Sequence, residues 1–411
     1  MKFLILTSLN SYLVAAQNQL LIICGKEIIM LIGVPKEIKN HEYRVGMIPA
    51  SVRELVQNGH DVIVETNAGI GIGFNDQDYI TAGASIEDEA ATIFAKADMI
   101  VKVKEPQTIE RAMLCEGQIL FTYLHLAPDL PQTQDLIDSK AVCIAYETVT
   151  DHKGRLPLLA PMSEVAGRMA IQAGAQALEK SNQGSGMLLG GVPGVAPAKV
   201  VIVGGGIVGN NAAQMAVGLG ADVTILDRNI DTLRNLNIQF GNSAKVIYST
   251  ADALEKEVLA ADLVIGAVLI PGATAPKLIT KAHIAKMKTG SAIVDVAIDQ
   301  GGCFETSHAT THQDPTYIVD EVVHYCVANM PGAVARTSTF ALNNATLPYI
   351  IKLANLGYQD ALKSDKGLLK GLNVINGLLT CESVAVAHDM EYVVPEIALA
   401  KQLDFTTVEA A

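Results

Sequence analysis

Three glycines stand at the spacing G-x-G-x-x-G, which could bring a peptide backbone against phosphate groups. Gly204, Gly206 and Gly209 follow the mostly apolar run 198–203. Because glycine has no side chain, the chain can turn tightly there and approach a pyrophosphate. The amino end of a following helix would offer free N–H groups to the phosphates. Asp227 closes the next apolar run, where a carboxylate could accept hydrogen bonds from ribose hydroxyls.

These parts come in the order of a dinucleotide-binding βαβ unit. A strand precedes the glycines, an Ala-rich helix follows and stops at Gly220, and the second strand spans 222–226. The same glycines in an ordinary strand–turn–helix would serve packing alone, which is the alternative interpretation. Asp227 would repel a 2′-phosphate, so the predicted cofactor is NAD. Arg228 directly after it leaves some use of NADP open.

Four polar residues follow predicted strands and could act on a small acid. Arg44 and Lys104 could bind a carboxylate through charge-assisted hydrogen bonds. Histidine side chains can gain and lose a proton near neutral pH, so His125 could move a proton to and from a carbonyl or carbinolamine oxygen. Asp299 could hydrogen-bond an ammonium or iminium group and assist the addition and loss of water.

Each of these residues also has a plain structural interpretation. Arg44 could be a surface ion-pair partner, and Lys104 could end a solvated loop beside an acid. His125, between two leucines, could be a core histidine with satisfied hydrogen bonds. Asp299 could be a turn residue ahead of two glycines. Their shared position after strands favours the functional interpretation, because ligands of parallel sheets bind at that edge.

The elements that must position these residues alternate between strand and helix patterns. This rhythm predicts an α/β fold of two doubly wound parallel-sheet (Rossmann-like) domains with a cleft between them. The predicted strands are 31–34, 60–65, 99–103, 118–124, 142–145, 198–203, 222–226, 245–248, 263–269, 292–296 and 317–319. We assign residues 30–160 and 336–411 to a substrate domain and 161–335 to an NAD-binding domain.

The helix patterns connect these strands and close the chain. One helix is predicted over 86–96, and another begins at 161–164, with Ser163 as its N-cap, and runs to about 180. After Pro331 the chain is predicted to be helical, with a kink at Pro348. These last helices are expected to return to the first domain.

Composition excludes several function classes. The chain has 411 residues, half of them hydrophobic, and a net charge of −13, which argues against a nucleic-acid partner. Six scattered cysteines without a C-x-x-C pair are typical of a reduced, cytoplasmic protein. The nine histidines form no metal-ligand pair, so we predict no metal site. No long apolar run occurs, so we predict no membrane span. Residues 1–16 loosely resemble a signal peptide. The first 29 residues could be a secretion signal, a short membrane-associated helix or an extension from an upstream start codon, and we interpret them as an extension with no role in the fold.

From Met30 onward the chain closely resembles the alanine dehydrogenase family. The resemblance implies NAD-dependent oxidative deamination of L-alanine to pyruvate and ammonium, and the reverse amination. One departure is GMIP at 46–49, where the family usually has an alanine and a hydroxyl residue before the proline. The stretches that carry the resemblance are GVPKE at 33–37, RV at 44–45, KVKEP at 102–106, TYLHLA at 122–127, PMSEVAG at 161–167, DVAIDQGG at 295–302 and CVANMP at 326–331.

The resemblance also implies residue roles and partners. Arg44 and Lys104 match the family's pyruvate-binding pair, and His125 and Asp299 match its catalytic pair. The family is generally a cytoplasmic homohexamer that needs no metal for hydride transfer. The residues that fall where the family contacts NAD are Ser163, Asp227, Ser249, Val268, Leu269 and Asn329.

Two other functions remain as alternatives. The NAD-binding subunit of a proton-translocating transhydrogenase shares the fold and the glycine motif, but needs a membrane partner and no amino acid. His125 and the stretch 300–304 favour the dehydrogenase. A catalytically silent NAD-sensing protein would not need all four polar residues.

Overall fold

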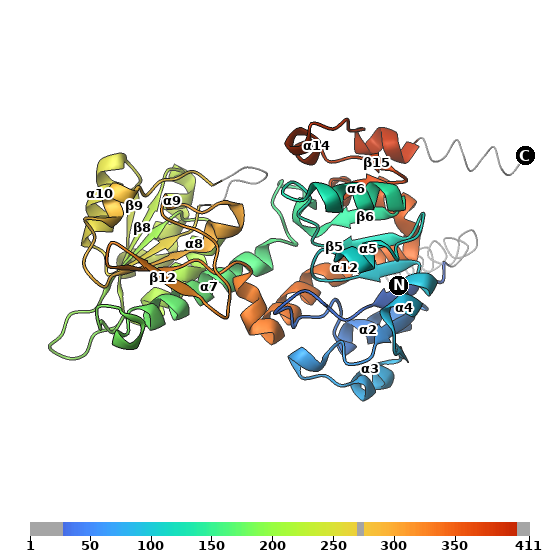
Figure 1. Cartoon of the computed structure of the whole chain (residues 1–411), viewed down its shortest axis with the longest axis horizontal. Coiled ribbons are helices and arrows are strands. Elements are labelled where there is room, and N and C mark those ends of the chain that lie inside the picture. Colours follow the sequence, from blue (N-terminus) through green and yellow to red (C-terminus); the bar gives the residue numbers. More distant parts are fainter. Residues whose placement is uncertain (1–27, 269–274, 401–411) are drawn as a thin grey trace, which may run out of the picture.

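The computed structural model describes residues 28–268 and 275–400 and folds them into two α/β domains that lie side by side (Figure 1). Each domain is built on a mostly parallel sheet with helices packed around it, which confirms the predicted fold class. The predicted extension, up to residue 27, and the predicted cofactor contact Leu269 lie outside the described residues.

The first sheet has the strand order β15-β14-β6-β5-β4-β1-β2-β3. Ile32 in β1 lies opposite Val62 on one side and Met99 on the other, so the chain winds away from β1 in both directions. Ligands of such sheets bind where the winding reverses. The strands are β1 (Leu31–Val34), β2 (Asp61–Glu65), β3 (Ser85–Glu87), β4 (Met99–Val101), β5 (Ile119–Thr122), β6 (Val142–Ala145), β14 (Leu372–Ile375) and β15 (Leu378–Leu379).

The second sheet has the order β12-β13-β11-β10-β7-β8-β9, with the reversal between β7 and β10. Its central strands are buried apolar runs, as expected of a parallel sheet covered on both faces. The strands are β7 (Lys199–Val203), β8 (Asp222–Asp227), β9 (Ala244–Tyr248), β10 (Leu263–Gly266), β11 (Ala292–Asp295), β12 (Thr316–Val319) and β13 (Val322–Tyr325).

Helices surround the two sheets, and α12 packs against α7 where the domains meet. The α-helices are α2 (Pro49–Gln57), α3 (Asp76–Ala82), α4 (Ala90–Lys96), α5 (Thr108–Arg111), α6 (Leu130–Ser139), α7 (Ala160–Ala177), α8 (Ile207–Gly218), α9 (Ile230–Phe240), α10 (Ala251–Ala260), α11 (Lys281–Ile284), α12 (Ala335–Ser364), α13 (Lys366–Leu369) and α14 (Glu382–His388). The short 3₁₀ helices are η1 (Ile70–Ile72), η2 (Tyr146–Thr148), η3 (Lys180–Asn182), η4 (Gly241–Ser243), η5 (Val296–Gln300) and η6 (Met330–Val334).

The C-terminal segment joins the first domain, as Figure 1 shows. Met30, Leu342 and Leu399 belong to one buried apolar cluster, so both ends of the described chain contribute to the same core. The division at residues 160/161 and 335/336 remains a prediction.

Several local predictions were wrong. The predicted helix 86–96 splits into β3 and α4, and the last segment contains the strands β14 and β15, which pair antiparallel. The helix α12 runs through Pro348, and its non-helical dihedral angles are at Gly357, with φ +69° and ψ 160°. Glycine tolerates this conformation, whereas proline keeps a φ that a helix accepts. Ser163 lies inside α7, whose N-cap is Leu159.

Candidate active site

The glycine turn leads from β7 into α8, and its geometry requires two of its three glycines. Gly204 has φ +102°, and a Cβ on Gly209 would lie 1.8 Å from the carbonyl oxygen of Gly204. Gly206 is the N-cap of α8, and no side chain caps this helix end. An added Cβ on Gly206 would meet nothing within 4 Å. The uncapped N–H groups and the open space beside them fit a pyrophosphate.

The carboxylate of Asp227 lies directly against this turn. Its Oδ2 accepts a hydrogen bond from the N–H of Gly205 at 2.7 Å, and its Oδ1 accepts one from Asn229 at 2.7 Å. Carboxylate oxygens can accept further hydrogen bonds, so ribose hydroxyls could still be bound. The Nε of Arg228 donates to the carbonyl oxygen of Ser249 at 3.3 Å. The turn and the acid therefore fit an adenine dinucleotide.

Two other predicted cofactor contacts follow strands of the same sheet. Ser249 follows β9, and its N–H donates to the carbonyl oxygen of Asp227 at 2.9 Å. Val268 follows β10, and its carbonyl accepts from the Cys303 thiol at 3.5 Å. Ser163 lies in the first turn of α7, the helix that packs on α8.

Arg44 is almost fully buried and is engaged by three residues. Its Nε and Nη2 donate to the two carboxylate oxygens of Glu42 at 2.6 and 2.5 Å, and its Nη1 donates to the sulfur of Met162 at 3.1 Å. Burial opposes the charge on Glu42, but the hydrogen bonds and charge of Arg44 outweigh it and lower the pKa of that carboxyl. Arg44 is therefore not a surface ion-pair partner.

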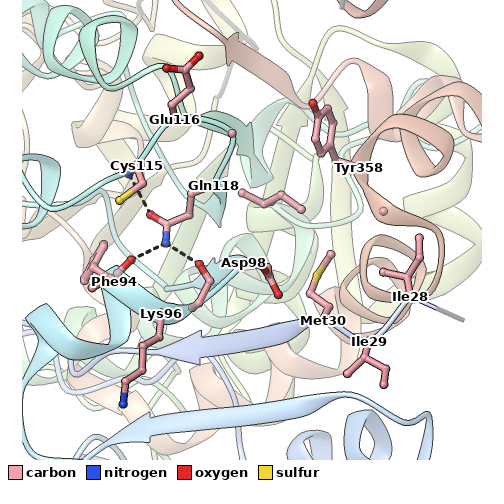
Figure 2. Close-up of a pocket in the computed structure, with 15 residues that line it drawn as sticks. Ile28, Ile29, Met30, Phe94, Lys96, Asp98, Cys115, Glu116, Gln118 and Tyr358 are labelled. Carbon is pink, nitrogen blue, oxygen red and sulfur yellow. Dashed lines mark hydrogen bonds between the residues drawn. The ribbon is translucent and has the colours of Figure 1, made fainter. Parts of the chain in front are cut away.

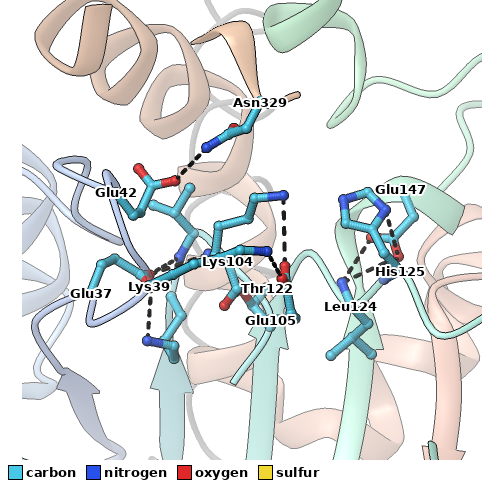
Figure 3. Close-up of polar contacts among 12 residues, drawn as sticks. Glu37, Lys39, Glu42, Lys104, Glu105, Thr122, Leu124, His125, Glu147 and Asn329 are labelled. Atoms are coloured by element: carbon cyan, nitrogen blue, oxygen red, sulfur yellow. Dashed lines mark hydrogen bonds and ion pairs between the residues drawn. The ribbon is translucent and has the colours of Figure 1, made fainter. Parts of the chain in front are cut away.

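Asn329, which follows β13 of the second sheet, contacts both residues of this pair, and Figure 3 shows its hydrogen bond to Glu42. Its Oδ1 accepts from Nη2 of Arg44 at 2.9 Å, and its Nδ2 donates to Glu42 at 3.2 Å. Asn329 has φ +58° and precedes η6, close to the start of α12. Asn329 is one of the predicted NAD contacts, and it also contacts Arg44, a predicted substrate-binding residue.

Lys104 follows β4 and lies at the same edge of the first sheet as Arg44, which follows β1. Its side chain is 13% exposed, and Nζ lies 3.6 Å from the Glu105 carboxylate. Glu105 also pairs with Lys39. Burial alone would raise the pKa of Glu105, but Lys104 and Lys39 lower it. The interpretation of Lys104 as a solvated loop end does not fit this burial.

His125 is not a core histidine, because its side chain is 43% exposed. It follows β5 and adopts a left-handed backbone with φ +51°. Its ring stacks on Tyr123, with ring centres 5.7 Å apart and planes 6° from parallel. The exposed ring is thus supported on one face and accessible to a substrate.

Glu147 is a candidate site residue that the sequence interpretation missed. Its Oε1 accepts hydrogen bonds from the N–H groups of His125 at 2.6 Å and Leu124 at 3.2 Å, and lies 3.9 Å from Nδ1 of His125 (Figure 3). The signal available was its position, since Glu147 comes just after β6, the neighbour of β5. Glu147 therefore fixes the unusual backbone of His125 and lies beside its ring.

Asp299 lies in η5, after β11, and its side chain is exposed. The structure places it on the second domain, whereas Arg44, Lys104 and His125 follow strands of the first. Among the described residues, no hydrogen bond or ion pair joins Asp299 to these three. The structure thus brings three predicted site residues to one sheet edge and joins Arg44 to Asn329.

Other features of the described chain lie away from this edge. A cavity of about 510 Å³ is lined by residues at the opposite ends of β1, β4 and β5, including Met30, Asp98 and Gln118 (Figure 2).

Within residues 28–268 and 275–400, no His, Cys, Asp and Glu side chains form a group of three suited to a metal ion. No helix in these ranges is long and apolar enough to cross a membrane.

Comparison with known proteins covers nearly the whole chain. Residues 33–166 match the family model "Alanine dehydrogenase/PNT, N-terminal domain", and residues 170–382 match "Alanine dehydrogenase/PNT, C-terminal domain". The chain is 61% identical to an alanine dehydrogenase of Halomonas elongata, over 89% of this chain and 98% of that protein. It is 57% identical to one of Methanococcus maripaludis, over 90% and 100%.

Solved structures give the same result. An L-alanine dehydrogenase superposes with a TM-score of 0.85 at 54% identity, covering 88% of this chain and 99% of that chain. A transhydrogenase from Sinorhizobium meliloti superposes with a TM-score of 0.73 at 24% identity, covering 86% and 99%. The second match shows a shared fold and nothing further.

Proposed function

This chain belongs to the alanine dehydrogenase/PNT family, and from that premise we propose that it interconverts L-alanine with pyruvate and ammonium using NAD. The enzyme is an oxidoreductase acting on a carbon–nitrogen bond. Identity of 53–61% to alanine dehydrogenases over about nine-tenths of the chain supports this activity. The structural observation that supports it most directly is the hydrogen bond from Arg44 to Asn329, which joins the two proposed binding regions.

Arg44 and Lys104 bind the substrate carboxylate in this proposal. A guanidinium has five N–H donors, and Glu42, Asn329 and the weak acceptor Met162 use most of those on Arg44. The donors on Nη1 remain the most available, because a sulfur is a weaker acceptor than a carboxylate. The substrate carboxylate therefore binds along the Nη1 side, with Lys104 as a second cation.

The remaining steps are proton transfers and hydride transfer. Bound NAD⁺ supplies the acceptor for the hydride from Cα of alanine, and NADH supplies the donor in the reverse direction. In the deamination direction, His125 accepts a proton from the water that adds to the imine carbon, and the carbinolamine then loses ammonia as its hydroxyl gives up a proton to form the carbonyl of pyruvate. In the amination direction, His125 protonates the carbinolamine hydroxyl, which leaves as water. Asp299 hydrogen-bonds the nitrogen of the ammonium or iminium group. Glu147 holds His125 in place for both directions.

Three further properties are proposals from the family resemblance. They are contacts of Ser163, Ser249, Val268, Leu269 and Asn329 with NAD, assembly as a homohexamer, and a cytoplasmic location. The transhydrogenase alternative has weaker support, because that likeness is limited to the fold.

An assay of the purified chain tests the activity. Formation of NADH that depends on L-alanine is the expected result, with pyruvate and ammonium supporting the reverse reaction. Hydride transfer between two nucleotides without an amino acid would instead favour the transhydrogenase function. Binding of NAD without either reaction would indicate a silent NAD-sensing protein.

A further inference from the structure

A lysine with no exposed surface lies two residues before Lys104, between two buried glutamates. Lys102 Nζ is 3.0 Å from Glu37 Oε2 and 2.7 Å from Glu110 Oε1, and no side chain of the three is more than 2% exposed. We call these residues the Glu37–Lys102–Glu110 triad. Burying charges is costly, and apolar residues of similar volume often replace such groups without loss of stability. Stability alone therefore gives little reason for the triad.

Glu37 also binds the backbone at Lys104. Its Oε1 accepts hydrogen bonds from the N–H of Val103 at 2.6 Å and from the N–H of Lys104 at 3.3 Å. Glu37 lies in the segment between β1 and α2 that also carries Arg44. One carboxylate thus connects the backbone of one proposed substrate-binding cation to the loop that carries the other.

Lys102 counteracts the effect of burial on this carboxylate. Burial raises the pKa of Glu37 above its ordinary value, and the charge of Lys102 and the hydrogen bond from Val103 offset that effect only in part. Burial would lower the pKa of Lys102, but Glu37 and Glu110 together raise it. A charged carboxylate is the stronger acceptor for two backbone N–H groups.

Glu110 has a different second role. Its Oε2 accepts from the N–H of Gln107 at 2.7 Å and so caps the short helix α5. No hydrogen bond that the structure shows among the described residues joins Glu110 to the backbone of Lys104. The two glutamates therefore share Lys102 but differ in what else they hold.

We propose that Glu37, paired with Lys102, is a positioning residue for substrate binding that fixes the backbone of Lys104 relative to the loop of Arg44, and that Glu110 takes no part in this role. This proposal rests on the proposed function, since it takes Lys104 and Arg44 as the carboxylate-binding cations. Glu37 does not touch substrate in it and acts through Lys104.

The test compares two chemically identical substitutions within the triad. Glu37→Gln leaves the Lys102–Glu110 pair neutral overall but weakens the bonds to the Lys104 backbone. We expect KM for pyruvate and for L-alanine to rise about tenfold, the loss of one charge-assisted hydrogen bond, with kcat and the Kd of NAD little changed. Glu110→Gln is the matched control, because it leaves the Lys102–Glu37 pair intact, and its KM values should stay near those of the unaltered enzyme.

Two further variants keep the result interpretable. Glu37→Asp retains the charge beside Lys102 but shortens the side chain, so KM should rise even if Glu37→Gln fails to fold. An unchanged KM in folded Glu37→Gln, or an equal rise in Glu110→Gln, overturns the positioning role. Lys104→Ala separates the two proposals. Raised KM there with normal KM in Glu37→Gln overturns the positioning role alone, whereas normal KM in Lys104→Ala overturns the proposed substrate role of Lys104 itself.

Discussion

Replacing Glu147 by Gln removes the charge that holds His125 while keeping the size of the side chain. The carboxylate accepts from the N–H groups of Leu124 and His125, the latter at 2.6 Å, and it is 15% exposed. An amide keeps one acceptor oxygen and turns an NH₂ group toward the remaining donors. His125 has φ +51°, a left-handed conformation that a non-glycine residue adopts at a cost.

The magnitude follows from these contacts. Losing one hydrogen bond to a charged acceptor costs about 1.5–3 kcal/mol. A left-handed non-glycine residue stores on the order of 1–3 kcal/mol, which the surrounding contacts must offset. These contacts stabilise the working position of the His125 ring. Each 1.4 kcal/mol of that stabilisation that is lost lowers the rate about tenfold. We therefore expect kcat to fall about ten- to a hundredfold. We also expect the variant to unfold at a lower temperature than the unaltered enzyme.

The assay is steady-state kinetics in both directions, with thermal unfolding and NAD titration on the same preparations. NAD affinity should be unchanged, because Glu147 lies in the first domain. Glu116→Gln is the matched control, since Glu116 is an exposed glutamate paired with Lys140 at 3.3 Å, far from this edge of the sheet. A Glu147→Gln enzyme with normal kcat and normal thermal stability would refute the argument that this carboxylate holds His125.

Three other expectations follow from single residues. His125→Ala should lower kcat by orders of magnitude while NAD titration still shows normal binding, and unimpaired turnover would remove His125 from the chemistry. Asp227→Ser should weaken NAD binding and favour NADP relative to the unaltered enzyme, whereas equal NAD affinity would exclude the ribose contact. Glu42 has a pKa below its ordinary value of 4.5 in the folded chain, so its charge stabilises the fold above that pH and this contribution is lost as the pH falls further. Glu42→Gln should therefore be less stable at neutral pH and lose less free energy of unfolding on acidification. Denaturant titrations from neutral pH to below 4.5 would measure this difference. A loss as large as that of the unaltered chain would contradict the role of the Glu42 charge.

Local sequence patterns predicted most of the strands and helices, because the formation of these elements depends largely on residues close together in the sequence. Short apolar runs predicted the central strands, since such runs are buried in parallel sheets. Predictions failed where tertiary contacts decide between alternatives of similar local energy. The run 86–96 has apolar residues at both strand and helix spacing, and pairing of Ile86 with Val64 turns its first part into β3. The break in α12 occurs at Gly357, although Pro348 is the stronger local signal.

By itself the sequence determined the α/β rhythm, the glycine turn with Asp227, and the set of polar residues that follow strands. These are properties of neighbouring residues, which short-range sterics and burial control. Only the tertiary structure decided which carboxylates reach these polar residues. Glu147 meets His125 across 22 positions of sequence, and Asn329 meets Arg44 across 285. Such contacts depend on how sheets and helices pack, because a polar side chain after a strand has no local preference for its distant partner.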